Sequence, residues 1–136
     1  MVLLYHTCYQ NLPPVHKADI EFFAASFHPS SREVLKQSEH VVLYQEKQNL
    51  LGLAVVSPEV NNVVDLTLIG VAHPKQKQGI GTEVLTYVID ELQRERSLRV
   101  RIPRRYNFEQ LNSFFEKRDF AKIMMDETGA ELVRKS

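Results

Sequence analysis

Apolar residues along this chain recur in two different spacings, and polar turns separate one run from the next. Short apolar runs bounded by Pro, Asn or Gly are typical of strands, whereas apolar residues three and four positions apart are typical of amphipathic helices. Strands are predicted over residues 2–6, 40–45, 50–57, 63–72, 98–102, 120–125 and 130–134. Helices are predicted over residues 13–27, 31–36, 82–94 and 108–117. The predicted elements follow one another as a meander, then strand–helix–strand–helix, then a final hairpin. This order predicts one α/β domain with a mixed sheet over residues 1–136.

The helical apolar stripes supply the predicted core on one side of the sheet. In the helix over residues 82–94 the stripe consists of Val84, Leu85, Val88, Ile89 and Leu92. An earlier group of aromatics, Phe22, Phe23 and Phe27, is also expected in the core. In the strand over residues 98–102 apolar and basic residues alternate, so Arg99 and Arg101 are expected to point away from the core.

Composition narrows the function classes. Lys plus Arg and Asp plus Glu number 17 each, so the formal net charge is zero and nucleic acid is not an expected partner. The single cysteine, Cys8, excludes an intrachain disulfide. Because neither a signal peptide nor a run of membrane-spanning length stands out, we expect a cytoplasmic protein without a membrane partner.

The loop that precedes the helix over residues 82–94 has the character of an anion site. Two glycines, Gly79 and Gly81, lie where an apolar strand passes into a helix, and Lys75 and Lys77 lie just before them. A helix start offers unpaired backbone N–H groups and the positive end of the helix dipole, and glycine lets a phosphate approach the backbone. Val84 breaks the G-x-G-x-x-G spacing of dinucleotide sites, and the G-K-[S/T] ending of triphosphate loops is absent. On the glycines alone, a tight turn that merely starts a helix is an equal alternative.

A wider pattern around these glycines resembles the GNAT superfamily of acyl-CoA-dependent N-acyltransferases. Gln76-x-x-Gly79-x-Gly81 matches the family's [Q/R]-x-x-G-x-[G/A] motif, and Val71 lies five residues before Gln76, as the family's strand valine does. Residues 51–55 resemble the family's third strand, and residues 114–120 resemble its F-Y-E-K-x-G-F segment. The resemblance implies a mixed, mostly antiparallel sheet of six to seven strands flanked by about four helices.

The resemblance also implies acetyl-CoA as co-substrate and places its binding residues. Backbone amides from Gln78 to Thr82 would hold the pyrophosphate, and the strand at residues 70–72 would pair with the pantetheine arm. The implied cofactor-binding residues are Gly70, Val71, Ala72, Gln76, Lys77, Gln78, Gly79, Ile80, Gly81, Thr82 and Phe115, and no metal is expected. The amine acceptor would attack the thioester directly with both substrates bound.

Two residues are candidates for proton transfer from the amine. Asp65 lies eleven residues before Gln76, where some family members have a glutamate base. The alternative is a solvated residue at the start of a strand. His73 stands where the family often has proline and titrates near neutral pH. The alternative is a surface histidine. With unbroken alternation, Asp65 and His73 share one face of the strand with residues 67, 69 and 71, and a bulge would break that parity.

Phe115 departs from the family pattern, because many members have a tyrosine here that protonates the leaving CoA thiolate. Three possibilities follow: the thiolate leaves unaided, Tyr106 or a water substitutes, or the protein binds acyl-CoA without turnover. The first function hypothesis is therefore an N-acetyltransferase acting on a small-molecule or protein amine. The second is a non-catalytic acyl-CoA-binding or regulatory module, and a third is an interaction protein without CoA.

The acceptor itself does not follow from the sequence, although some features bear on it. The early helices border the acceptor pocket in this fold, so one of the aromatics Phe22, Phe23 or Phe27 is expected there. Arg104 or Arg105 is a candidate for the CoA 3′-phosphate and Arg101 for an acidic acceptor, against the alternative of a solvated basic face. The strands over residues 41–45 and 130–134 are candidate edges for a homodimer.

Overall fold

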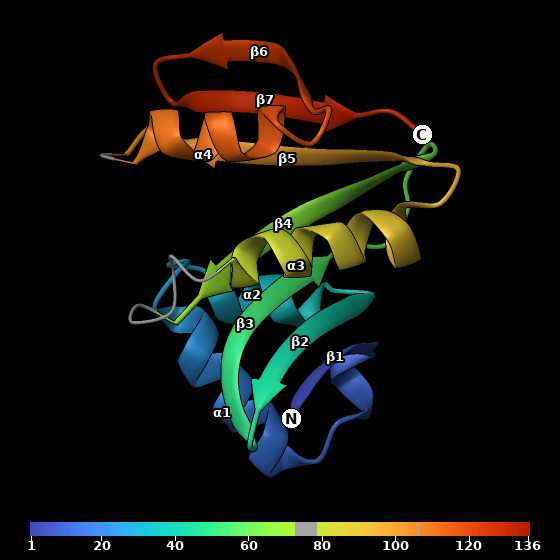
Figure 1. Cartoon of the computed structure of the whole chain (residues 1–136), viewed down its shortest axis with the longest axis vertical. Coiled ribbons are helices and arrows are strands. Elements are labelled where there is room, and N and C mark those ends of the chain that lie inside the picture. Colours follow the sequence, from blue (N-terminus) through green and yellow to red (C-terminus); the bar gives the residue numbers. More distant parts are fainter. Residues whose placement is uncertain (73–78, 106) are drawn as a thin grey trace.

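The computed structural model describes residues 1–72, 79–105 and 107–136, and its centre is one seven-stranded sheet (Figure 1). The strands are β1 (Val2–Thr7), β2 (His40–Glu46), β3 (Asn49–Val56), β4 (Val63–Val71), β5 (Ser97–Pro103), β6 (Ala121–Asp126) and β7 (Gly129–Arg134). The α-helices are α1 (Pro14–Ala25), α2 (Ser31–Lys36), α3 (Ile80–Tyr87) and α4 (Phe108–Glu116). These elements confirm the predicted fold class, and the bounds differ from the predicted ones by one or two residues for most elements.

The sheet order is β1-β2-β3-β4-β5-β7-β6, and among the strands of the described residues only the central β4–β5 pair is parallel. Short turns join the antiparallel strands of the β2-β3-β4 meander and the β6–β7 hairpin, whereas β1 pairs with β2, and β5 with β7, across longer connections that contain helices. The parallel β4–β5 pair needs the helical crossover that α3 provides. The edges of the sheet are β1 and β6. The prediction that residues 41–45 or 130–134 form an edge is therefore wrong, because β2 lies between β1 and β3 and β7 lies between β5 and β6.

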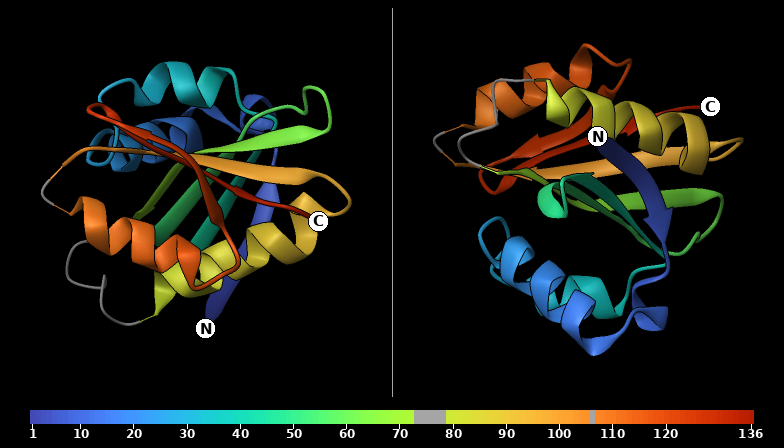
Figure 2. Two further views of the ribbon diagram at one scale, coloured as in Figure 1. Left: turned by 90° about the horizontal axis from the view of Figure 1, so that it is seen from above. Right: turned by 60° about the horizontal axis from the view of Figure 1, so that its bottom comes forward.

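Helices cover both faces of the sheet (Figure 2). On one face, here called the α3 face, α3 and α4 pack on a core that includes Val84, Leu85 and Phe115. On the other, the α1 face, α1 and α2 pack on a second core that includes Ile20, Ala24 and Leu35. Because β2 and β3 are covered on both sides, their sequences are nearly continuous apolar runs, whereas β4 is also covered but carries Asp65 and Thr67 between its apolar residues.

A β-bulge in β4 changes which side chains face which layer. Val55 pairs with Leu68 and Val56 pairs with Leu66, so Thr67 is the extra residue, and its hydroxyl donates to the Val55 carbonyl at 3.1 Å. Leu66 consequently packs in the α3-face core and Leu68 in the α1-face core. The side chains of β4 therefore do not alternate regularly between the two faces, and residues before and after Thr67 follow different patterns.

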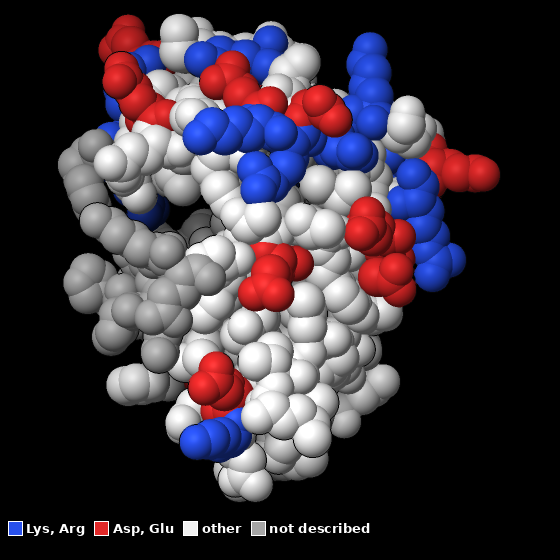
Figure 3. Space-filling view, in the orientation of Figure 1, with Lys and Arg blue, Asp and Glu red and all other residues white. Residues whose placement is uncertain are grey.

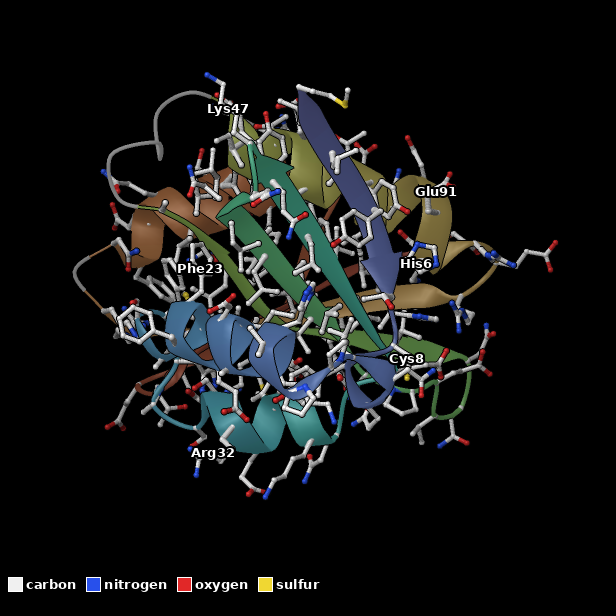
Figure 4. All side chains as sticks on the ribbon, turned by 90° about the horizontal axis from the view of Figure 1, so that it is seen from below. His6, Cys8, Phe23, Arg32, Lys47 and Glu91 are labelled. Carbon is white, nitrogen blue, oxygen red and sulfur yellow. The ribbon has the colours of Figure 1, made fainter. Side chains whose placement is uncertain are left out.

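Two further predictions need correction or refinement. Phe22 is not a core residue, because its side chain is 84% exposed, whereas Phe23 packs against the α1-face core and points toward the sheet in Figure 4. The helix predicted over residues 82–94 begins at Ile80 and widens into a π-helical segment, η3 (Val88–Gln93). There the buried Gln93 amide donates to the Arg134 and Arg96 carbonyls. Within the part of the chain that the structure describes, no helix is long and apolar enough to cross a membrane.

Candidate functional site

The site lies where the two parallel strands separate. The ladder between β4 and β5 runs from Val63–Ser97 to Leu66–Val100, and past that point the strands diverge (Figure 1). The bulge at Thr67 follows directly, and β4 then continues its ladder with β3. A cavity of about 560 Å³ fills the opening, lined by residues of β4, β5, β7, α4 and the α1–α2 connection.

On the α3 face the wall of this cavity is apolar. Its residues come from β4, β5 and α4: Leu66, Ile69, Val100, Ile102, Leu111 and Phe115. Phe115 is only 1% exposed and makes T-shaped ring contacts with Phe114 and Phe120, with centroids 5.1 and 5.2 Å apart. This half of the cavity suits an uncharged, partly apolar chain.

On the α1 face the wall carries charges instead. Asp65 and Arg99 lie opposite each other in the parallel ladder, and the Arg99 Nε–Asp65 Oδ1 and Nη2–Oδ2 distances are 2.6 and 3.0 Å. The hydrogen bonds that Arg99 donates to Asp65 raise the pKa of the Arg99 guanidinium, and the nearby Glu131 charge adds to this effect. Such a bidentate, charge-assisted pair holds the planes of both groups in place.

A second carboxylate lines the same wall from β7. Glu131 lies between Ala130 and Leu132, which both pack in the α3-face core, so its side chain is on the α1 face. Its ladder partner is Arg101, whose Nη2 donates to the Thr128 hydroxyl at 2.6 Å. Glu131 is half-buried and lines the cavity.

The connection between α1 and α2 closes this half of the cavity with Phe27, His28 and Pro29. The backbone N–H of Ser30 donates to His28 Nδ1 at 3.0 Å, so in the neutral ring the proton lies on Nε2. Burial, and then the charge of Arg105, lower the pKa of His28, which favours that neutral form. Arg105 lines the cavity as well, at an exposed position after β5.

The start of α3 lies next to the end of β4. Gly79 is the N-cap residue with φ of 81°, a left-handed conformation that disfavours residues with a side chain. A Cβ on Gly81 would lie 3.6 Å from Val71 and 3.7 Å from Phe114, so this turn stays close to both β4 and α4. The described backbone from Gly79 onward thus offers a helix N-terminus beside the divergence of β4 and β5.

A second hollow separates the start of α3 from α4. Its lining residues are Thr82, Glu109, Gln110, Ser113, Phe114, Lys117 and Arg118. The Arg118 guanidinium lies over the Phe114 ring, 5.6 Å from its centroid. Figure 3 shows this face of the molecule: charged side chains of both signs gather over the half that holds α4, β6 and β7, and few lie over β1 to β3.

The residues singled out in the sequence fall into three groups. Gly70, Val71, Ala72, Gly79, Ile80, Gly81 and Thr82 lie at the end of β4 and the start of α3, and Asp65 and Phe115 line the cavity. His73, Gln76, Lys77, Gln78 and Tyr106 lie outside the described residues. Sequence reasoning missed Glu131 and His28. Phe27, one of the early aromatics expected to border the acceptor pocket, lines the cavity.

Arg104 does not line the cavity, whereas its neighbour Arg105 does. The Arg104 guanidinium lies 4.4 Å from the centroid of the Phe108 ring and donates to the Asp126 carbonyl at 3.1 Å. Arg99 and Arg101 point away from the α3-face core that holds Leu98, Val100 and Ile102, as predicted, but Arg99 is paired with Asp65 rather than simply solvated. Among the described residues, no group of three or more His, Cys, Asp or Glu side chains is arranged to hold a metal ion.

Comparison with known proteins identifies the family. The family profile described as an acetyltransferase (GNAT) domain matches residues 11–133. The chain therefore belongs to the GNAT acetyltransferase family. A search of curated proteins found no match.

Solved structures of the same fold support this assignment. An acetyltransferase from Bacillus subtilis in complex with CoA is 14% identical, with a TM-score of 0.77 over 100% of this chain and 99% of that one. A GNAT family acetyltransferase from Elizabethkingia anophelis with acetyl-CoA bound is 15% identical, with a TM-score of 0.71 over 99% and 98%. The ribosomal-protein-S18-alanine N-acetyltransferase from Escherichia coli is 15% identical, with a TM-score of 0.73 over 98% and 91%. At these identities the likeness concerns the fold.

Proposed function

We propose that this protein transfers an acetyl group from acetyl-CoA to an amine by direct attack in a ternary complex. The observation that carries the proposal is the cavity between β4 and β5, which has an apolar wall on one face of the sheet and a charged wall on the other. A thioester arm and a polar amine can enter such a cavity from opposite sides and meet at the divergence. The reaction then gains mainly from orientation, because two reactants are held in one geometry.

The co-substrate fits the residues at the α3 face. The edge of β4 that faces the opening, residues 67–70, can pair with an extended amide-containing arm as an added strand. Backbone amides at the start of α3, Gly79 to Thr82, suit the pyrophosphate, and we assign Gln76, Lys77 and Gln78 to the same loop on the family motif. The second hollow, with Lys117 and Arg118, suits the remaining phosphate and the nucleoside.

Each wall has a distinct part in the transfer. Leu111 and Phe115 keep water from the thioester on the apolar side, and this protects the acyl group from hydrolysis. On the charged side the amine nitrogen forms a bond to the thioester carbonyl carbon, and the C–S bond breaks. Starting from its ammonium form, the acceptor gives up two protons, one of which passes to water before the attack and one of which ends on the departing sulfur.

An acyl-CoA-binding module without turnover is the second candidate, and Phe115 is the observation in its favour. A phenyl ring cannot donate a proton to the thiolate. The charged wall favours transfer instead. Binding of acyl-CoA alone does not require charged side chains such as Asp65, Arg99 and Glu131 on the acceptor side of the thioester.

The test is calorimetric titration of the purified protein with acetyl-CoA, followed by release of free CoA thiol against a panel of primary amines. We expect 1:1 binding and thiol release with at least one amine. Binding without thiol release across the panel would favour the binding module. Absence of binding would contradict the proposal as a whole.

A further inference from the structure

An amine acceptor arrives at neutral pH mostly as an ammonium ion, which cannot attack a carbonyl carbon. The site must bind this cation and remove a proton from it. Carboxylates can do both, and the residues that line the cavity include two of them, Asp65 and Glu131. The two lie on the same face of the sheet, on opposite sides of β5.

Asp65 already forms an ion pair with Arg99. Both of its oxygens accept hydrogen bonds from the Arg99 guanidinium, at 2.6 and 3.0 Å. To bind an ammonium group it would have to give up part of a bidentate, charge-assisted interaction. The positive charge of Arg99 acts on both carboxylates, because Glu131 lies near Arg99 as well, but the Arg99 guanidinium donates its hydrogen bonds to Asp65.

Glu131 differs from Asp65 in its partners. Among the described residues, no hydrogen bond or ion pair joins the Glu131 carboxylate to another side chain. Its ladder neighbour Arg101 directs Nη2 to Thr128 at 2.6 Å. The Thr128 hydroxyl in turn donates to Asp126 at 2.6 Å, which places Arg101 in a separate polar group at the β6–β7 turn. Glu131 is therefore the cavity carboxylate with capacity left for a cation.

We infer that Glu131 binds the ammonium group of the acceptor and takes its proton before attack on the thioester. The inference rests on the proposed function and adds the residue that prepares the amine. One proton passes from R–NH₃⁺ to the Glu131 carboxylate and then to water. The free amine forms the C–N bond, the C–S bond breaks, and the second amine proton goes to the thiolate, so that R–NH₃⁺ and acetyl-CoA give the amide, CoA thiol and H⁺.

The experiment compares acceptors that differ in their need for a base. Hydroxylamine is uncharged at neutral pH, whereas an alkylamine is protonated. Thiol release from acetyl-CoA is measured with hydroxylamine and with the alkylamine that reacts fastest in the panel, in the unaltered protein, Glu131→Gln and Asp65→Asn. We expect Glu131→Gln to lower kcat/KM for the alkylamine about 100-fold or more, typical for loss of a general base, and to change the hydroxylamine rate less than fivefold.

Asp65→Asn is the matched control, because it also removes one carboxylate from the charged wall. It should affect both acceptors by the same factor, since it disturbs the geometry with Arg99 rather than proton removal. Calorimetric binding of acetyl-CoA to each variant checks that the fold is intact. If Glu131→Gln left the ratio of the two acceptors unchanged, or if Asp65→Asn alone altered it, the inference would be overturned.

Absence of thiol release from the unaltered protein with every amine is a different result, because it contradicts the proposed transferase function itself.

Discussion

Gly70 of β4 and Phe27, which follows α1, are in such close contact that a side chain at position 70 has no room. A Cβ built on Gly70 would lie 2.5 Å from both Cγ and Cδ2 of the Phe27 ring. This contact fixes Phe27, which lines the cavity from the α1–α2 connection, against the strand that diverges from β5. One glycine thereby couples the α1 layer to the proposed site of transfer.

Gly70→Ala should consequently destabilise the protein and move Phe27. We expect the free energy of unfolding to fall by about 1–3 kcal/mol, the usual cost of overpacking. Urea unfolding measures this. Gly81→Ala is the control, because its Cβ would meet its nearest neighbour at an ordinary 3.6 Å. Adding Phe27→Leu to Gly70→Ala should recover part of the lost stability. If Gly70→Ala and Gly81→Ala lost equal stability, the contact with Phe27 would not be the cause of the loss.

Gly79 should resist replacement for a different reason. A Cβ there has nothing within 4 Å, so the cost lies in the backbone, whose φ is 81°. We expect Gly79→Val to lower the free energy of unfolding by about 1–2 kcal/mol and to weaken acetyl-CoA binding at least tenfold. Gly79→Asn should cost less, because asparagine tolerates this conformation. Calorimetry on both variants measures the effect, and unchanged affinity in Gly79→Val would argue against a phosphate at this turn.

Stability should decrease in mild acid because two histidines resist protonation in the folded state. Burial and then the charge of His40 lower the pKa of His6, and burial and then Arg105 lower the pKa of His28. His6 lies beside Glu91 in Figure 4, and its Nδ1 is 2.7 Å from the Tyr87 hydroxyl. The unfolded chain binds the proton more tightly than the folded one. The stability is therefore complete above the ordinary value of 6.5 and is lost as the pH falls through 6.5 toward the lower folded values.

The measurement compares urea midpoints at about pH 7.5 and 5.5, which bracket the ordinary histidine pKa. The double variant His6→Gln/His28→Gln should lose less stability between the two pH values than the unaltered protein does. His16→Gln, at an exposed position in α1, is the control. An equal loss in all three proteins would show that other groups determine the dependence.

Phe115→Tyr tests whether the leaving thiolate lacks an acid. Because the ring lines the apolar wall and is buried, we expect acetyl-CoA affinity to stay within about threefold and thiol release to rise by about tenfold to a hundredfold, as a positioned acid would allow. Phe114→Tyr is the matched control, since Phe114 lines the second hollow instead. An unchanged rate in Phe115→Tyr would mean that the thiolate leaves without a proton from this position.

The sequence predicted the elements well because each apolar run is bounded by a strong turn signal, as at Pro58 and Gly129. It did not predict the bulge at Thr67. Both faces of β4 are covered, so Leu66 and Leu68 appear as one alternating set although they point to opposite layers. The exposed Phe22 was misassigned because its neighbour Phe23 takes the inward position on α1.

The cofactor side of the site was easier to predict than the acceptor side. Gly79 and Gly81 are two positions apart in the sequence, and the motif that contains them is local. The charged wall joins Asp65, Arg99 and Glu131 from three strands, and each alone resembles an ordinary outward-facing polar residue. Only the sheet order β4-β5-β7 brings them onto one wall, so local patterns carried no signal for Glu131.

Binding of acetyl-CoA along β4 and α3 is the central claim, and the five glycines of the chain allow a direct test. Selective ¹⁵N-glycine labelling gives one amide signal each for Gly52, Gly70, Gly79, Gly81 and Gly129. On titration with acetyl-CoA, we predict large shifts for Gly70, Gly79 and Gly81 and the smallest shift for Gly129 at the β6–β7 turn. Unmoved signals for Gly79 and Gly81 at saturating acetyl-CoA would contradict the account.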